Sequence, residues 1–536
     1  MQMKLGMWDH RFPTWLCLVC GCIAAVGCHI PELRTAKQQT VLPSDFTIAT
    51  NSDAATAAIQ RESPSGNVAE LPVDEFYRDP ALLTLLSQAV NNNRELETLN
   101  EEIVIAENEL RLRRWAYFPF ITFDAESGLE KPSLFTPQGA VEDQLEARPG
   151  VGFPEPLPNF RFGFNLFMPI DIWRQYRNAR DAALQRYFAA VENRNDFLIR
   201  LVSEISQTYF ELLALDRRLQ NLDQIIAIQE KSLELAMARK EAGRDTELPV
   251  QRFLAELAKN RSEKQVLVQE ITELENRLNV LTYRPPQRVV RTAATFDDPD
   301  KYMLQVGVPA QLLLNRPDIR RAERALAAAG LDVLVARADF FPRVDIGAGV
   351  GWEAFNPRYL DFRPEVLIYN VAGNLAVPVV NRSAIKAAYL SANARQLQAL
   401  YDYQQTIINA YAEVINYLAM SENYRRSAEL KQQQMQALEA SVDVATRLFQ
   451  NARVEYVEVL LAQRDLLESQ MTLIEARRKQ FMAHVLLYRA LGGGAVWSSG
   501  RLGVSALLPD PATVEQLVPP VPSQQESTDE VPADRT

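Results

Sequence analysis

Two long stretches of the chain repeat apolar residues with a period of seven. In the first stretch, about 174–241, apolar side chains stand seven apart at Ile205, Leu212, Leu219, Ile226 and Leu233. The second stretch, about 381–450, keeps this step, apart from the polar Ser421, at Leu400, Ile407, Val414, Ala428, Met435, Val442 and Phe449. A sustained period of seven is typical of coiled-coil packing. The pattern therefore predicts two helices on the order of 100 Å long, at about 1.5 Å per residue.

Four short segments change from this helical period to strict alternation of apolar and polar residues. They are FITFDAESG (120–128), FRFGFNLF (160–167), VDIGAGVGW (344–352) and LIYNVAGNLAV (367–377). Their length and alternation are typical of outer-membrane barrel strands, although a soluble hairpin capping a helical rod alternates in the same way. Gly, Asn, Asp and Thr on the polar side favour a wet lumen. Aromatic residues near the segment ends favour a membrane interface: Trp115, Tyr117, Trp173, Tyr176, Trp352 and Tyr359.

Four strands are too few to close a barrel, since small barrels need about eight. An open sheet edge cannot stand in lipid, because each unsatisfied backbone group there costs several kcal/mol. If the four segments cross a membrane, the chain must therefore oligomerise, and each protomer contributes four strands.

The chain also contains an internal repeat of about 200 residues. Paired prolines in corresponding motifs lie 342 − 119 = 223 and 378 − 169 = 209 residues apart, and the helix breaks at Gly243 and Ala452 also differ by 209. This spacing is too long for a solenoid unit and indicates a duplicated domain. Each repeat contains a moderate helix (about 80–116 and about 316–340), two alternating segments, a long helix and a closing helix.

The repeats define the predicted domain organisation. We expect a signal peptide at 1–27, a linker at 28–70, a first repeat at 71–283, an inter-repeat linker at 284–307, a second repeat at 308–495 and a disordered tail rich in Pro, Ser and Glu at 496–536. The two β-hairpins are expected at about 118–168 and about 341–378.

All four cysteines lie in the first 28 residues of the chain. Lys4 and Arg11 precede an apolar run at 15–26, and small residues then precede Cys28. This is the pattern of an export signal, and the run is shorter than the ~20 residues of a membrane-spanning helix. The end of the run resembles a bacterial lipobox, which implies that Cys28 becomes the acylated N-terminus. An ordinary signal peptide with incidental cysteines is the alternative.

Composition argues against nucleic-acid binding and against catalysis. The net charge of −11 and the pI of about 5.2 are unsuited to a phosphate backbone. Beyond the predicted signal, the only histidines are His29 and His484. No Gly-rich phosphate loop, metal-spaced cluster or nucleophile elbow is visible in the sequence. We therefore expect no enzyme and no cofactor, and His484 is expected to be packed or at the surface.

Several motifs resemble the outer-membrane efflux protein family, the TolC-like channel-tunnels, and in particular its lipoprotein branch. The resemblance covers about 70–495 and rests on the Cys28 lipobox, LPVDEFYRDP (71–80), DPALLTLLSQAVNNNRELE (79–97), LLNRPDIRRAE (313–323) and LLYRALGGG (486–494). It implies a mainly α-helical protein with long coiled-coil helices and a homotrimer. Its 12-stranded barrel would lie in the outer membrane and continue as an α-helical tunnel in the periplasm.

The resemblance also implies a function and partners. Such a protein is the passive exit duct of a tripartite efflux system, working with a periplasmic adaptor and an inner-membrane pump of the resistance-nodulation-division type. Two alternatives remain, namely the outer-membrane component of type I protein secretion and a lipid-anchored periplasmic coiled coil without a pore.

The helix breaks are the candidate functional site. In EAGRDTELPV (241–250), Gly243 suits a left-handed turn and Pro249 suits the start of a helix. NARVEYVEV (451–459) occupies the same place in the second repeat, with Ala452 where the family usually has glycine. The resemblance implies that both turns form the periplasmic aperture and dock the adaptor, through Gly243, Arg244, Asp245, Glu247, Ala452, Arg453, Glu455 and Glu458. Three-fold repetition would turn each carboxylate into a ring that favours cations. The plainer alternative is that these charges only solvate the turns.

Overall fold

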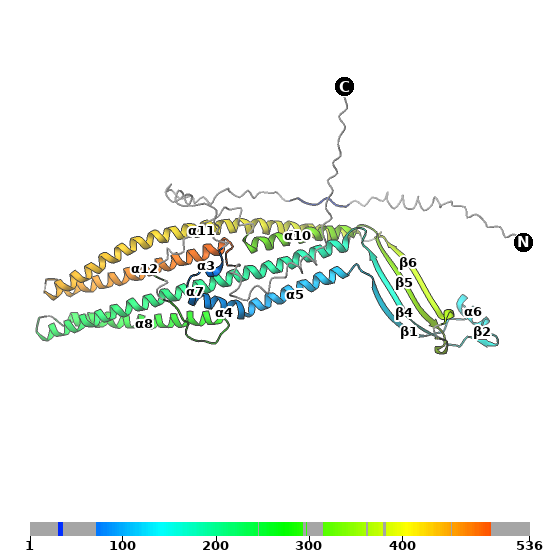
Figure 1. Ribbon diagram of the computed structural model, residues 1–536, viewed down its shortest axis with the longest axis horizontal. Coiled ribbons are helices and arrows are strands. Elements are labelled where there is room, and N and C mark those ends of the chain that lie inside the picture. Colours follow the sequence, from blue (N-terminus) through cyan, green and yellow to red (C-terminus); the bar gives the residue numbers. More distant parts are fainter. Residues whose placement is uncertain are drawn as a thin grey trace, which may run out of the picture. The chain divides into compact units, whose positions relative to one another are not determined.

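The computed structural model describes residues 30–35, 71–244, 246–292, 296, 315–360, 363–378, 382–451 and 453–494. The described chain is mainly helical and contains one four-stranded sheet (Figure 1). It divides into two compact units, each built from three separate stretches of sequence. The described parts of 1–45, 97–196 and 309–412 form the first unit, and those of 46–96, 197–308 and 413–536 form the second.

The first unit holds the sheet. Its strands are β1 (Phe120–Glu130), β4 (Leu157–Ile170), β5 (Arg343–Ala354) and β6 (Leu367–Ala376). They pair antiparallel in the order β1-β4-β5-β6, which Figure 1 shows as four adjacent arrows. All four alternating segments of the sequence are therefore confirmed as strands.

The strand register sorts the side chains onto two chemically different faces. One cross-strand row runs Phe123, Phe164, Val350 and Tyr369. The adjacent row runs Thr122, Asn165, Gly349 and Asn370. Because successive residues of a strand point to opposite sides, the first row belongs to an apolar face and the second to a polar face. The apolar face is open in the described chain, since Tyr369 is 80% and Phe123 is 59% exposed.

The long helices occur where the heptads predicted them. Helix α7 spans Gln175–Glu241 and α11 spans Arg382–Gln450. The closing helices α8 (Glu247–Leu281) and α12 (Tyr456–Ala490) both have 35 residues, and their starts differ by 456 − 247 = 209. Helices α5 (Arg94–Trp115) and α10 (Pro317–Ala338) both have 22 residues, and their starts differ by 317 − 94 = 223. These lengths and offsets agree with the duplication seen in the sequence.

The single helix expected at about 80–116 is wrong. The chain forms α4 (Pro80–Asn92) and α5, with extended backbone at Asn93 between them. The Asn93 side-chain oxygen accepts a hydrogen bond from the backbone N–H of Leu96 at 3.0 Å, which caps the start of α5. Its amide nitrogen donates to the backbone oxygen of Leu281 at 3.2 Å. The cap at Leu96 and the bond to Leu281 thus favour a break in the helix at Asn93, where periodicity alone predicted one continuous helix.

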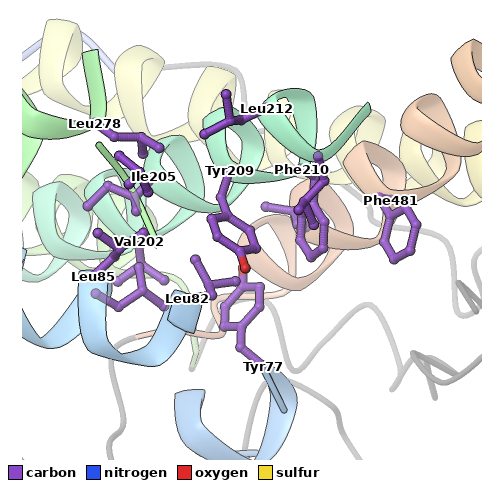
Figure 2. Packing of buried hydrophobic residues seen from close by; sticks show 14 of the residues in the cluster. Tyr77, Leu82, Leu85, Val202, Ile205, Tyr209, Phe210, Leu212, Leu278 and Phe481 are labelled. Atoms are coloured by element: carbon purple, nitrogen blue, oxygen red, sulfur yellow. The ribbon is translucent and has the colours of Figure 1, made fainter. Parts of the chain in front are cut away.

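The second unit contains the largest buried cluster, which fixes the middle of α7. Figure 2 shows Tyr209 of α7 pointing toward Leu82 of α4 and Phe210 of α7 lying beside Phe481 of α12. The Phe210 and Phe481 rings stack with centroids 4.7 Å apart. The cluster therefore holds three helices that are distant in sequence against one another.

A polar network lies within this apolar cluster. The Tyr209 hydroxyl donates to Asp79 Oδ2 at 2.8 Å and accepts a hydrogen bond from the Thr292 N–H at 3.2 Å. Asp79 Oδ1 also caps α4 by accepting from the Ala81 N–H at 2.9 Å. Buried polar groups are costly unless they are satisfied, so this network specifies one arrangement of α4 and α7.

Short elements complete the described fold. Helix α3 spans Val73–Phe76, and α6 (Pro137–Gln144), β2 (Glu146–Arg148) and β3 (Val151–Gly152) lie between β1 and β4. The sequence analysis did not predict these elements, because each is too short to show a period. Among the described residues, no helix combines the length and apolar character needed to cross a membrane.

Candidate functional site

The first helix break is a tight turn built on glycine. Gly243 has φ +67°, a left-handed conformation that favours glycine because it has no Cβ. The Arg244 N–H donates to the Arg239 oxygen and the Gly243 N–H to the Lys240 oxygen, both at 2.9 Å. These two bonds define a Schellman motif that ends α7. Pro249 is the third residue of α8, so the predicted left-handed turn at Gly243 and the predicted place of Pro249 at a helix start are confirmed.

The charges of the first turn are partly paired locally. Glu247, the first residue of α8, forms an ion pair with Lys240 and accepts a hydrogen bond from Gln251 Nε2 at 2.8 Å. The hydrogen bond from Lys240, and to a smaller extent the hydrogen bond from Gln251, holds the pKa of the Glu247 carboxyl below its usual value. Arg244 is exposed, and Asp245 lies outside the described residues. The sequence analysis missed Lys240, although a basic residue in the last turn of a helix is a known stabilising signal.

The second helix break closes in the same manner. The Arg453 N–H donates to the Leu448 oxygen at 2.9 Å, which corresponds to the Arg244–Arg239 bond of the first turn. Ala452, at the position equivalent to Gly243, lies outside the described residues. Both turns therefore end a long helix by the same backbone hydrogen bond.

A groove lies beside the second turn. It has a volume of about 370 Å³, and its lining includes Val444, Leu448, Val454, Glu455 and Glu458. Both glutamates are exposed, and the Glu458 N–H donates to the Glu455 oxygen at 3.2 Å in the first turn of α12. The structure thus brings two of the candidate carboxylates together at an apolar groove.

A single arginine joins the ends of the two long helices. Arg239 Nη1 donates to the backbone oxygen of Phe449 at 3.0 Å, and the guanidinium lies 4.6 Å from the centroid of the Phe449 ring. Phe449 is buried. Tyr456 and Leu460 of α12 also pack against the buried cluster of Ala236, Val250 and Phe253. Sequence reasoning missed Arg239, because its acceptor is a backbone carbonyl 210 residues away.

The polar face of the sheet is a second candidate site. Asp124 Oδ2 accepts hydrogen bonds from Asn165 Nδ2 at 2.7 Å and from Thr122 Oγ1 at 2.9 Å. A hollow of about 510 Å³ lies on this face and includes Asp124 and Arg161. Its floor includes Gly163, Gly349 and Gly351, where a side chain would meet neighbouring atoms at 2.4–2.6 Å. The three glycines therefore leave space for the hollow, and carboxylate, amide and guanidinium groups line it.

The NRPDIR segment, 315–320, begins α10 and contacts α7. Pro317 begins the helix, and Asp318 accepts hydrogen bonds from Arg316 at 3.0 and 2.6 Å. Burial opposes ionisation of Asp318, but the hydrogen bonds and charge of Arg316 outweigh it and hold the pKa of this carboxyl below its usual value. Arg320 pairs with Glu192 of α7 at 2.8 Å. The motif that carried part of the resemblance therefore has a structural role here.

No group of three or more His, Cys, Asp or Glu side chains is placed to hold a metal ion within the part of the chain that the structure describes. His484 is buried in α12, which is the packed one of the two positions expected for it. The arrangement offers polar surfaces and exposed helix turns, both of which suit conduction and docking.

The described chain combines a four-stranded antiparallel sheet, which has an apolar and a polar face, with two helices of 67 and 69 residues, α7 and α11. The model of the outer membrane efflux protein family matches residues 85–282 and 308–493 of this chain. The chain belongs to the outer membrane efflux protein family. It is therefore an efflux protein of the outer membrane.

Two relatives and one solved structure illustrate the similarity. The cation efflux system protein CusC of Escherichia coli O6:H1 is 26% identical over 490 residues, covering 90% of this chain and 99% of CusC. The probable outer membrane lipoprotein SilC of Salmonella typhimurium is 26% identical over 490 residues, covering 89% of this chain and 97% of SilC. The crystal structure of a membrane protein from Pseudomonas aeruginosa has a TM-score of 0.74 at 25% identity and covers 86% of this chain and 99% of its own. The similarity therefore extends over nearly the full length of each protein.

Proposed function

We propose that this chain is the outer-membrane exit duct of a tripartite efflux system. It conducts substrates passively from an inner-membrane pump and a periplasmic adaptor to the exterior, and it catalyses no reaction. The observation that carries the proposal is the register of the sheet, which gathers apolar residues on one face and polar residues on the other. Such a sheet suits a wall between lipid and water.

The duct is a homotrimer with a 12-stranded barrel. The sheet ends in β1 on one side and β6 on the other. Each unsatisfied backbone group at such an edge costs several kcal/mol in lipid, so the edges must pair with those of other copies. Three copies of four strands give 12 strands. This number is sufficient, because a small barrel needs about eight strands. Asp124, Arg161 and Asn165 then line the lumen, and Phe123 and Tyr369 face lipid.

The two helix breaks form the periplasmic aperture and dock the adaptor. Exposed Arg244, Arg453, Glu455 and Glu458 and the apolar groove beside α12 support this role. Asp245, Glu247 and Ala452 belong to the same turns. In a trimer each carboxylate occurs three times around the axis, and rings of carboxylates favour cations.

The protein is anchored in the outer membrane through Cys28. The signal at 1–27 is removed, Cys28 carries the acyl chains, and the segment up to residue 70 links the anchor to the first repeat. The confinement of all cysteines to the first 28 residues supports this proposal. The relative SilC is named a probable outer membrane lipoprotein.

Native mass spectrometry of the detergent-extracted outer-membrane fraction tests the assembly. We expect a trimer whose protomers begin at Cys28 and are heavier by three acyl chains. A monomer would overturn the barrel and leave a tethered helical rod. A trimer without acyl chains would keep the duct and overturn the anchor. Cross-linking from position 458 in cells then identifies the adaptor and the class of pump.

A further inference from the structure

The first described residues of the chain lie against the helices of the first unit. Ile30 and Leu33 pack against the buried cluster formed by Val333 of α10, Phe340 just after it, and Tyr389 and Ala392 of α11. Both side chains are partly buried. Residues 30–35 therefore occupy a defined position against α10 and α11. We refer to these residues as the N-terminal strap.

One buried side chain holds the strap by its backbone. Asn393 Oδ1 accepts a hydrogen bond from the Arg34 N–H at 3.1 Å, and Asn393 Nδ2 donates to the Arg34 oxygen at 3.3 Å. Asn393 is 2% exposed. A buried amide must satisfy both its donor and its acceptor. Asn393 does so by binding the backbone N–H and the backbone oxygen of Arg34, and these two bonds fix the position of Arg34 in the strap.

A cavity borders the cluster that the strap contacts, because Ile385 belongs to both. It has a volume of about 360 Å³, within the range of small-molecule sites. Its lining comes from the ends of β4, β5 and β6, from the segments beside them and from the start of α11. The apolar part includes Ile170, Trp173, Phe341, Val344, Val377 and Ile385, and the polar part includes Asp171, Gln175, Asp339 and Arg343.

The strap and the cavity share their structural support. Ile385 lines the cavity and packs against the same buried cluster as Ile30. Phe341 lines the cavity and directly follows Phe340 of that cluster. The cavity opens where the strands meet the helices, which in the proposed duct is the periplasmic edge of the membrane.

We propose that an acyl chain carried by Cys28 occupies this cavity, so that the strap and the cavity together fix the lipid anchor to the barrel wall. The inference rests on the acylation of Cys28 in the proposed function. Cys28 precedes Ile30 by two residues, which span at most about 7 Å of extended chain. Ile30, which packs against the cluster that borders the cavity, is thus only two residues from the anchor in sequence, and the apolar part of the cavity lining suits a hydrocarbon chain.

Photo-cross-linking of the full-length protein in outer membranes tests this assignment. The photoreactive residue p-benzoylphenylalanine replaces Trp173 or Ile385, which line the cavity, and in the control it replaces Ile408, an exposed residue further along α11. After irradiation and proteolysis, mass spectrometry identifies the peptide or lipid attached to each position. Native mass spectrometry confirms that each variant assembles. We expect the acylated N-terminal peptide to be attached at 173 and 385 but not at 408.

The strap provides a second, independent variant. Asn393→Ala removes both hydrogen bonds to Arg34, and we expect it to lower the cross-linking yield at position 385 severalfold. Ser391→Ala, at an exposed position two residues earlier on α11, is the matched control and should leave the yield unchanged.

The remaining outcomes overturn the inference in distinguishable ways. Attachment of free phospholipid alone, or of no lipid, would show that the Cys28 chain is not in the cavity. An unchanged yield in Asn393→Ala would show that the strap does not position the anchor. A trimer without acyl chains would remove the anchor itself while leaving the proposed duct intact.

Discussion

The pairing of β4 and β5 depends on two glycines that face each other across the strands. Gly163 and Gly351 are register partners on the polar face. A Cβ at Gly163 would lie 2.5 Å from the Val350 oxygen and 2.6 Å from Gly351 Cα, although ordinary contacts begin at 3.4 Å. Both neighbours are backbone atoms, so the strands themselves would have to separate. We predict that Gly163→Ala weakens this pair of strands.

The structure gives a magnitude for this prediction. Overpacking costs roughly 1–3 kcal/mol, and an overlap of about 0.9 Å with backbone belongs in the upper part of that range. Removing a glycine also restricts the unfolded chain, which returns about 0.4–1 kcal/mol. A net loss of about 1–2.5 kcal/mol corresponds to an opening equilibrium about 5- to 60-fold larger.

Hydrogen exchange with mass spectrometry on the detergent-solubilised protein measures this opening locally. We expect peptides from β4 and β5 to exchange about 5- to 60-fold faster in Gly163→Ala, and also faster in Gly351→Ala. The matched control is Gly373→Ala in β6, where a Cβ would meet nothing within 4 Å. Equal protection in Gly163→Ala and Gly373→Ala would refute the reasoning, because the predicted difference depends only on the space at each position.

Three further predictions concern the helix turns and α10. Arg239→Ala removes the hydrogen bond and the ring contact with Phe449. We expect a loss of about 1 kcal/mol and therefore about fivefold faster hydrogen exchange in residues 445–456. Unchanged hydrogen exchange in this segment would contradict a stabilising contact between Arg239 and Phe449. Glu458→Gln removes one proposed carboxylate per protomer, so the reversal potential across a planar bilayer in a KCl gradient should move toward zero, and an unmoved potential would take Glu458 out of the conducting path. Asp318 has a lowered folded pKa, so its contribution to stability is present above the unfolded pKa of about 3.9 and is lost as pH falls through the folded value. Thermal melting should therefore show a larger loss between pH 5 and pH 3 in the parent than in Asp318→Asn, and equal losses would contradict the assignment.

Periodic signals were sufficient to predict the long elements. The heptads gave α7 and α11 to within one or two residues at each end, because an apolar seam repeated over many turns has few alternative interpretations. Strict alternation gave the four strands, and the polar face could be expected from residues such as Asn165 and Gly349. The left-handed conformation of Gly243 was also predictable, since few other residues adopt it readily.

Other features depended on contacts that the sequence does not encode locally. The break at Asn93 depends on a hydrogen bond to Leu281, 188 residues away. The Arg239 bond to Phe449 reaches a backbone oxygen, which any residue provides. Glu247 was expected at the turn, but its ion pair with Lys240 required the turn geometry. Cys28 lies outside the described residues, so its acylation stays a prediction.

A cysteine scan along β6 tests the proposed duct most directly. Every natural cysteine lies in the first 28 residues, and only Cys28 follows the predicted cleavage site, so a single new thiol reports without background from other strands. Single cysteines replace residues 368–375 in outer membranes and are treated with a water-soluble maleimide and with a membrane-partitioned maleimide. We expect positions 370, 372 and 374 to react with the water-soluble reagent and positions 369, 371 and 375 to react with the membrane-partitioned reagent. Reaction of all positions with the water-soluble reagent would contradict a membrane-spanning barrel.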